Sequence, residues 1–318
     1  MRSDIRRYAL RLQITTACQL RCGYCRPDAV GTRRGAGLLD LEMVRACRLL
    51  SKLGVDRIRL TGGEPLLRED IVRLVARLAE MEELEEVTLT TNGQRLADLA
   101  RPLRRAGLHR VNVHIDSLDA GRYRRICGGD LGRALDGLAA AVAMKLSPRV
   151  NVVVQRGLNE DEIPAFCALA RELGVIVRFI EIMDTGIAPE LATRAFVSGS
   201  EIGLTLEALG ARRAPRSGSA PAVDYRFADG TVVGVIASET EPFCESCDRL
   251  RLGLDGVLRT CLYAGAGLDV GALLRSHAPD RWVAERLRAH IAAKRSEHPS
   301  GPGAVRLGRG FSMAAVGG

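Results

Sequence analysis

Six short apolar runs recur between residues 8 and 182 and have the length and composition of β-strands. The intervals between them carry apolar residues at helical spacing, which predicts helices beginning near Leu41, Glu69, Arg95, Gly132 and Asp161. Strands separated by helices need crossover connections, so they form a parallel sheet covered by helices. The runs are YALRLQIT, DRIRLT, EVTLTT, RVNVHI, RVNVVV and VIVRFIEI. The pattern predicts an α/β fold, a partial (β/α)6 barrel of the TIM type.

The pattern changes beyond about residue 197. A segment rich in Gly, Pro, Ser and Ala, RRAPRSGSAPAV, leads into DYRFADGTVVGVIA, which predicts a β-hairpin with its turn at Asp229 and Gly230. Helical patterns follow around Ala272 and Trp282, and residues 296–318 read as a loose tail. We therefore expect a barrel over residues 1–197 and a smaller α+β domain over residues 198–318.

The composition is that of a folded protein with an anionic partner. Of 318 residues, 47% are hydrophobic, which is enough for a core without disulfides, and the formal net charge is +8. Aromatic residues make up only 4%, too few for base-stacking surfaces, so we expect a small polyanion and no nucleic acid. The start, MRSDIRRYALRL, is charged where a signal peptide is apolar, and no segment has the apolar run that spans a bilayer. We expect a cytoplasmic protein with no membrane partner.

Nine cysteines in a cytoplasmic chain are expected to stay reduced. Three of them, Cys47, Cys127 and Cys167, stand alone and are most simply small buried hydrophobes. The other six fall into two triads, and cysteines at motif spacing in a reduced chain indicate metal ligands or catalytic groups.

The first triad, Cys18, Cys22 and Cys25, lies in CQLRCGYC directly after the first predicted strand. Three cysteines at this spacing can ligate three irons of a [4Fe–4S] cluster and leave the fourth iron without a protein ligand. Such an open metal position is where a substrate or cosubstrate binds. A zinc site would need a fourth ligand, and no other cysteine or histidine lies nearby in the sequence.

The second triad is Cys244, Cys247 and Cys261. One interpretation is a structural zinc site that Asp248 or His277 completes. The other is a second [4Fe–4S] cluster with an open iron.

Two arginines follow the second triad's CxxC pair at alternate positions. On a strand, Arg249 and Arg251 would face the same side beside the metal. Paired guanidiniums can hold phosphate oxygens in bidentate fashion, although each could equally be a solvated surface residue.

Further chemistry-bearing segments follow other predicted strands: GGEP follows the second and TNG the third. In a βα barrel the active site is built from loops at the carboxyl ends of the strands. We therefore expect these loops, the first triad and the segment after Ile182 to meet on one face.

These motifs resemble those of the radical S-adenosylmethionine superfamily, whose signature is CxxxCxxC with an aromatic residue, here Tyr24, before the third cysteine. GGEP resembles the superfamily's second motif. The full set resembles the GTP 3′,8-cyclase family of molybdenum cofactor biosynthesis, and the resemblance covers nearly the whole chain. The set comprises CxxxCxxC, LTGGEPLLR, LTTNG, VRFIEIMDTG, a CxxC with 13 residues before its last cysteine, and a terminal Gly-Gly.

The resemblance implies two [4Fe–4S] clusters and S-adenosylmethionine as cofactors, with GTP as the substrate. In the family, a 5′-deoxyadenosyl radical abstracts the ribose 3′ hydrogen and the C3′ radical attacks C8 of guanine. The positions implied for S-adenosylmethionine are Tyr24, Gly62, Gly63, Glu64, His114 and Met183. Those implied for GTP are Arg11, Arg59, Thr90, Arg149, Arg249, Leu250 and Arg251. The implied catalytic positions are Arg249, Arg251, Gly317 and Gly318, the last two in a tail that reaches the active site.

Five positions depart from the family pattern. Arg57 and Arg149 stand where the family usually has lysines, and His114 stands where it usually has a serine. Thr16-Ala17 replaces the usual Asp-Arg before the first cysteine. Guanidinium and ammonium groups are not interchangeable at a phosphate contact. A diverged relative acting on another nucleotide or a peptide therefore stays an alternative, as does a zinc-stabilised binding protein. The resemblance further implies a reductant or electron-donor protein and a successor enzyme that forms cyclic pyranopterin monophosphate, and it allows a homodimer.

Overall fold

This computed structural model describes residues 6–25, 37–183, 189–263 and 266–294. The strands in these ranges form one twelve-stranded sheet. The strand order is β12-β11-β10-β1-β2-β3-β4-β5-β6-β9-β8-β7. Its centre is a run of six parallel strands in chain order. These are β1 (Tyr8–Gln13), β2 (Val55–Thr61), β3 (Glu86–Thr91), β4 (Arg110–His114), β5 (Arg149–Val154) and β6 (Ile176–Glu181).

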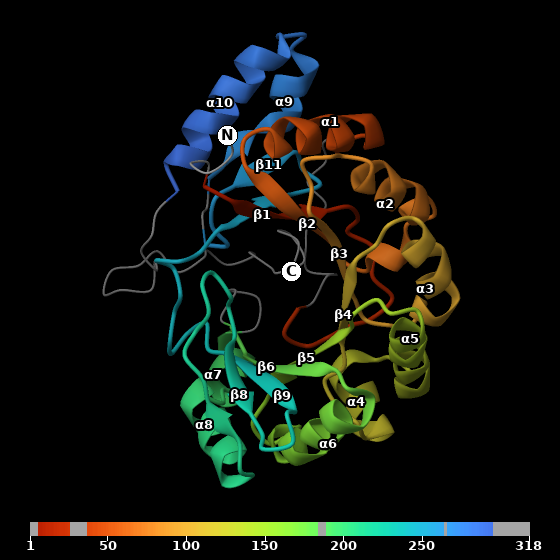
Figure 1. The fold of residues 1–318 in the computed structure, drawn as a ribbon, viewed down its shortest axis with the longest axis vertical. Helices are drawn as coiled ribbons and strands as arrows, with labels where there is room; N and C mark the ends of the chain where they lie inside the picture. The colour runs from red at the N-terminus through yellow and green to blue at the C-terminus, as the bar shows by residue number, and fades with distance from the viewer. Residues whose placement is uncertain (1–5, 26–36, 184–188, 264–265, 295–318) are drawn as a thin grey trace.

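In the described part of the chain, six helices connect these strands. Figure 1 shows the sheet curved, with the helices around its outer side. They are α1 (Asp40–Ser51), α2 (Ile71–Ala79), α3 (Leu96–Arg105), α4 (Ala120–Cys127), α5 (Leu131–Ala143) and α6 (Ile163–Leu173), with 3-10 turns η2 (Pro65–Leu67) and η3 (Glu160–Glu162). All six predicted strands are present, and the five predicted helices begin within two residues of their expected starts.

Helix α4 was not predicted. It has only 8 residues, too few to display a full helical period. Its ends nevertheless carry local signals. The Asp119 carboxylate accepts the N–H of Arg122 at 2.7 Å, and Gly128 closes the helix with a φ of 75°.

The chain beyond residue 197 adds strands to both edges of the barrel sheet. The predicted hairpin is present as β8 (Val223–Arg226) and β9 (Val232–Ile236), and β9 pairs parallel with β6. At the other edge, β10 (Arg249–Leu252) pairs parallel with β1. The boundary expected at residue 197 stays a prediction, because strands on both sides of it share one sheet. The other elements are α7 (Pro189–Arg194), α8 (Gly199–Ala208), β7 (Arg212–Arg213), β11 (Val257–Arg259), β12 (Leu268–Asp269), α9 (Val270–Arg275) and α10 (Asp280–Ala292).

The two faces of the barrel sheet differ in chemistry. Alternate residues such as Leu10, Leu12, Ile58 and Leu60 are fully buried in the hydrophobic core under the helices. The residues between them point to the concave side, which we call the inner face. On the inner face lie Arg11, Arg57, Arg59, Thr88, Thr90, Arg110, Asn112, His114, Arg149, Asn151, Arg178, Arg249 and Arg251. Among the described helices, none has the length and apolar character needed to cross a bilayer.

Candidate functional site

The first cysteine triad lies in the loop after β1, and this loop is docked on the end of α4. The N–H of Arg21 donates to the Cys127 carbonyl at 2.8 Å, and the N–H of Gly23 donates to the Ile126 carbonyl at 3.3 Å. The N–H of Leu20 also points at the Cys18 sulfur, at 3.4 Å. Backbone N–H groups directed at cysteine sulfurs stabilise thiolate ligands of iron–sulfur clusters. The triad thus fits a cluster.

The GGEP segment packs backbone to backbone against the same loop. A Cβ at Gly62 would lie 2.4 Å from the Thr15 carbonyl oxygen, and one at Gly63 would lie 2.3 Å from that of Ala17. The N–H of Gly63 donates to the Thr15 carbonyl at 2.9 Å. Both glycines are therefore required here by the close approach of the two loops. Whether they also contact S-adenosylmethionine stays a prediction.

Glu64 ties the GGEP segment to the TNG segment. Its buried carboxylate accepts the Thr91 hydroxyl at 2.7 Å, and the N–H groups of Asn92 at 2.7 Å and Leu66 at 2.9 Å. Burial raises the pKa of Glu64, although these donors oppose the rise. Its side chain thus positions the loops that surround the first triad.

Tyr24 connects the cysteine loop to β4 and β5. Its hydroxyl donates to the Asp116 carboxylate at 2.6 Å, and the same carboxylate accepts the N–H of Val153 at 2.8 Å. His114 lies beside this pair, with its Nδ1 3.7 Å from the Asp116 Oδ1. The loops after β1, β2 and β3 therefore meet on one face, as predicted, and the loop after β4 joins them. The predicted segment after Ile182 lies largely outside the described residues.

Six arginines from neighbouring strands gather on the inner face: Arg11, Arg59, Arg149, Arg178, Arg249 and Arg251. We call them the arginine cluster. Strand register places Arg11 opposite both Arg59 and Arg251. Neighbouring Arg110 is instead neutralised by Glu86, at 2.7 Å.

The charges of the arginine cluster repel one another. Burial and the charges of Arg149, Arg59 and Arg110 lower the pKa of Arg178 to about 9. Burial and nearby arginines lower the pKa of Arg59 and of Arg251 to about 10, and they lower that of Arg11 well below its usual range. Buried cations that depress one another's pKa form a site that a polyanion would stabilise.

Arg57 does not belong to this cluster, although it lies on the same face. Its guanidinium donates to Asp56 at 2.9 Å and to Asp248 at 2.7 Å. Asp248 also accepts the Ser219 hydroxyl at 2.7 Å. Asp248 is thus engaged with other side chains, which disfavours its predicted alternative role as a zinc ligand.

The second cysteine triad lies next to the arginine cluster at the edge of the sheet. The Cys247 N–H donates to the Cys244 carbonyl at 3.2 Å, and a guanidinium nitrogen of Arg249 lies 3.5 Å from the Cys247 sulfur. Although burial opposes it, the charges of Arg249 and Lys294 lower the pKa of Cys247. Burial and the charges of Cys261 and Cys247 raise the pKa of Cys244, so Cys244 interacts electrostatically with both other thiols of the triad. This triad also fits a cluster whose ligands are thiolates.

The other zinc candidate, His277, is exposed in the turn before α10. Within the described ranges, no three His, Cys, Asp or Glu side chains converge as a single metal ion would require.

Some predicted residues have a different placement. The Leu250 side chain is fully buried on the outer face of β10, away from Arg249 and Arg251, so only its backbone could contact a nucleotide. Met183 is half-buried just after β6. Gly317 and Gly318 lie outside the described residues.

The three isolated cysteines are buried as predicted. Burial raises the pKa of Cys47 to about 12 and that of Cys167 to about 11. Cys127 differs because its carbonyl accepts the N–H of Arg21 from the cysteine loop at 2.8 Å, while its thiol donates to the Tyr123 carbonyl within α4 at 3.0 Å.

Sequence reasoning missed Asn112, Asp116 and Asn151. All three interrupt or directly follow strands of Val and Ile, in RVNVHID and RVNVVV. A polar residue at every second position of a buried strand was the available signal.

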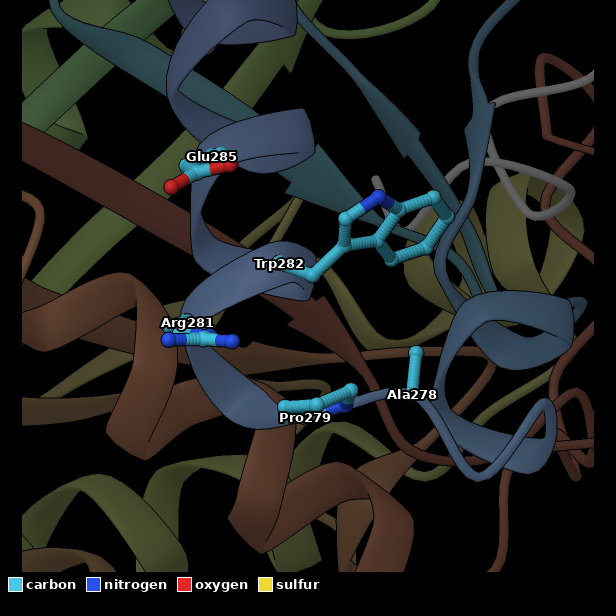
Figure 2. A pocket seen from close by; sticks show the side chains of 5 residues that line it. All are labelled: Ala278, Pro279, Arg281, Trp282 and Glu285. Carbon is cyan, nitrogen blue, oxygen red and sulfur yellow. The ribbon is translucent and has the colours of Figure 1, made fainter.

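A separate pocket of about 540 Å³ lies at the start of α10, lined by Ala278, Pro279, Arg281, Trp282 and Glu285 (Figure 2). It contains none of the predicted site residues. Trp282 stands 42% exposed there.

Comparison with known proteins identifies the class. The Radical SAM superfamily model matches residues 12–170, and the Molybdenum Cofactor Synthesis C model matches residues 175–300. This is therefore a radical SAM protein with the C-terminal region of molybdenum cofactor synthesis proteins. It is 41% identical over 296 residues to the GTP 3′,8-cyclase of Moorella thermoacetica, covering 91% of each chain. It is 37% identical to that of Xanthomonas axonopodis pv. citri, covering 97% of this chain and 96% of the relative. The chain belongs to the GTP 3′,8-cyclase family.

The structure is also similar to solved proteins. Streptococcus suis SuiB, solved bound to S-adenosylmethionine, has a TM-score of 0.67 at 15% identity, covering 98% of this chain and 74% of SuiB. At that identity the likeness shows the fold alone. Together the comparisons confirm the predicted α/β barrel, the radical SAM enzyme class, and S-adenosylmethionine and [4Fe–4S] clusters as cofactors. The roles of individual site residues stay predictions.

Proposed function

We propose that this protein cyclises GTP to (8S)-3′,8-cyclo-7,8-dihydroguanosine 5′-triphosphate in molybdenum cofactor biosynthesis. The observation that carries the proposal is the arginine cluster, which lies on the inner face beside the second cysteine triad. A triphosphate would place further negative charge among these like-charged guanidiniums and would accept their hydrogen bonds in bidentate fashion. A peptide substrate gives no comparable reason for six arginines, one buried and five half-buried, on one face.

The cofactors have distinct binding residues in this proposal. Cys18, Cys22 and Cys25 hold the first cluster; Cys244, Cys247 and Cys261 hold the second. When bound, the clusters and S-adenosylmethionine supply the 5′-deoxyadenosyl radical that removes the ribose 3′ hydrogen, after which C3′ bonds to C8.

The chain itself supplies orientation. Arg249 and Arg251 project from β10 toward the nucleotide, and Arg11, Arg59, Thr90 and Arg149 continue the same face. Leu250 contributes its backbone. The residues that surround the cosubstrate near the first triad are Tyr24, Gly62, Gly63, Glu64, His114 and Met183. The family resemblance also assigns a catalytic role to Gly317 and Gly318.

The proposed reaction also defines partners. Radical generation consumes one electron, and the radical left on the base after the C3′–C8 bond forms takes up a second electron and a proton to give the dihydro product. A reductant or electron-donor protein is therefore required. The cyclised nucleotide passes to a successor enzyme that forms cyclic pyranopterin monophosphate. We place the protein in the cytoplasm, where its thiols stay reduced, and the proposal is compatible with either a monomer or a homodimer.

The test is anaerobic. Reconstituted protein is analysed for iron and sulfide, then given S-adenosylmethionine, reductant and GTP, and the products are separated by mass. Eight irons per chain, 5′-deoxyadenosine and a cyclised guanosine nucleotide are expected, because two four-iron clusters contain about eight irons. 5′-Deoxyadenosine without a GTP product would favour the diverged relative, and bound zinc without iron would favour the binding protein.

A double variant tests the triphosphate role. Arg249→Ala with Arg251→Ala should abolish most GTP turnover but leave S-adenosylmethionine cleavage possible. The matched control is Arg286→Ala with Arg288→Ala, two exposed arginines at the same spacing on α10. Undiminished cyclisation by the first variant would remove the role assigned to these two arginines.

A further inference from the structure

Asn112 of β4 has a buried side chain whose polar atoms are unused. The residue is 0% exposed, and neither its amide nitrogen nor its amide oxygen has a hydrogen-bond partner within the described part of the chain. Leaving a buried donor or acceptor unpaired costs about 1–3 kcal/mol. Because buried polar groups are nearly always paired, this amide indicates a ligand.

The register of the sheet places Asn112 among nucleotide positions. Its Cα partners are Thr90 on β3 and Arg149 on β5, both on the inner face. In the proposed function both contact GTP, so the inference rests on that function. The group that Asn112 meets would then belong to the nucleotide.

The hydrogen-bonding capacity of the amide indicates which nucleotide group Asn112 would contact. Guanidiniums only donate hydrogen bonds, which suits phosphate oxygens, whereas an amide offers a donor and an acceptor together. A phosphate oxygen cannot satisfy the Asn112 oxygen, because it carries no hydrogen to donate. The base is expected at the second triad beside β10, and β4 lies four strands away in the sheet order. A ribose hydroxyl both donates and accepts, so it can satisfy both amide atoms.

We propose that the Asn112 amide hydrogen-bonds to a ribose hydroxyl of the nucleotide and so distinguishes GTP from its deoxy analogues. The arginine cluster supplies charge attraction that any triphosphate would satisfy. Asn112 adds a contact that depends on the sugar. A site built to bond a hydroxyl rejects an analogue that lacks it, because its own polar atoms are then left unpaired.

The experiment measures binding without turnover. Kd values for GTP, 2′-deoxyGTP and 3′-deoxyGTP are determined by anaerobic equilibrium dialysis on reconstituted protein without reductant. The wild type should bind at least one deoxy analogue about tenfold more weakly than GTP. Asn112→Leu should bind GTP about as weakly as that analogue, with no further loss when the hydroxyl is absent.

Two further variants test whether the loss of discrimination is specific to the Asn112 side chain. Asn112→Ser keeps a group that donates and accepts and should retain part of the discrimination. Asn151→Leu replaces an inner-face asparagine whose register neighbours are His114 and Arg178. Only its oxygen is buried without a hydrogen-bond partner in the described residues, and the variant should discriminate like the wild type.

The outcomes separate the two proposals. Failure of the wild type to bind GTP would overturn the proposed function. A wild type that binds all three nucleotides equally would overturn only the inference, as would Asn112→Leu with the wild-type ratio. Equal loss of discrimination in Asn112→Leu and Asn151→Leu would also overturn it, because the effect would then be a general disturbance of the inner face.

Discussion

Replacement of Arg178 by methionine should make the free protein more stable and the nucleotide-bound protein less so. Arg178 lies on β6 opposite Asn151, and its Nε is buried without a hydrogen-bond partner in the described ranges. Burial and the charges of Arg149, Arg59 and Arg110 lower its pKa to about 9. Methionine keeps the length of the apolar stem and removes the charge.

The sign of the effect follows from linkage. A guanidinium whose pKa is lower in the folded chain than in the unfolded chain binds its proton less tightly when folded, so folding is penalised at every pH below about 9. At about 1.4 kcal/mol per pKa unit, the upper bound is several kcal/mol. Relaxation, water and bound anions reduce this, and we expect a gain of about 1–2 kcal/mol at neutral pH. The penalty declines progressively as the pH rises from the folded-state pKa toward the higher pKa of the unfolded chain.

The assay is the thermal midpoint of anaerobically reconstituted protein, with and without GTP, at one scan rate. Without nucleotide, Arg178→Met should melt about 2–4 °C higher than wild type. With saturating GTP the advantage should shrink or reverse, because the wild type gains more from the triphosphate. Arg101→Met, an exposed arginine on α3, is the control and should change neither midpoint. A variant that is less stable than wild type without nucleotide would refute the reasoning.

Three other substitutions test the packing around the two triads. Gly63→Ala should lower the iron retained per chain, because its Cβ would lie 2.3 Å from a carbonyl oxygen of the cysteine loop; full iron content would contradict this. Tyr24→Phe removes the 2.6 Å hydrogen bond to Asp116 and should lower the free energy of unfolding by about 1–2 kcal/mol, measured by denaturant titration. An unchanged free energy of unfolding would show that this hydrogen bond does not stabilise the fold. Arg57→Met leaves the buried carboxylate of Asp248 without its cation, so the iron bound at the second triad should fall while the signal of the first cluster persists. Equal loss of both clusters would contradict this link between Arg57 and the second triad.

The sequence predicted the elements of the barrel well because its strands and helices have different periods. Runs such as RVNVVV are too apolar for any exposed strand, and turns such as Asp229–Gly230 have a strong local preference. The short helix α4 escaped because 8 residues show too little periodicity. The pairing of β9 with β6 and of β10 with β1 could not be predicted, since nothing local in either strand specifies a partner so distant in the chain.

The sequence likewise revealed some features of the candidate site and not others. The cysteines are visible because their spacing within short loops is local. The arginine cluster is not, because its members come from five strands and meet only when the sheet curves. Single arginines in a chain with only three lysines carry little information. Asn112 and Asp116 were hidden for a related reason, since one polar residue in a strand says nothing about which partners it faces.

The two departures from lysine look alike in sequence but differ in the structure. Arg57 bridges two carboxylates, with Nε on Asp56 and Nη2 on Asp248, an arrangement that uses the fork of a guanidinium and that one ammonium group would not reproduce. At that position arginine strengthens a link between the barrel and the second cysteine loop. Arg149 instead stays in the arginine cluster, where burial and the charge of Arg110 lower its pKa. A lysine there would carry a compact charge on a flexible stem. Of the two departures, Arg149 is therefore the one that bears on the proposed nucleotide site, whereas Arg57 is explained by its two carboxylate partners.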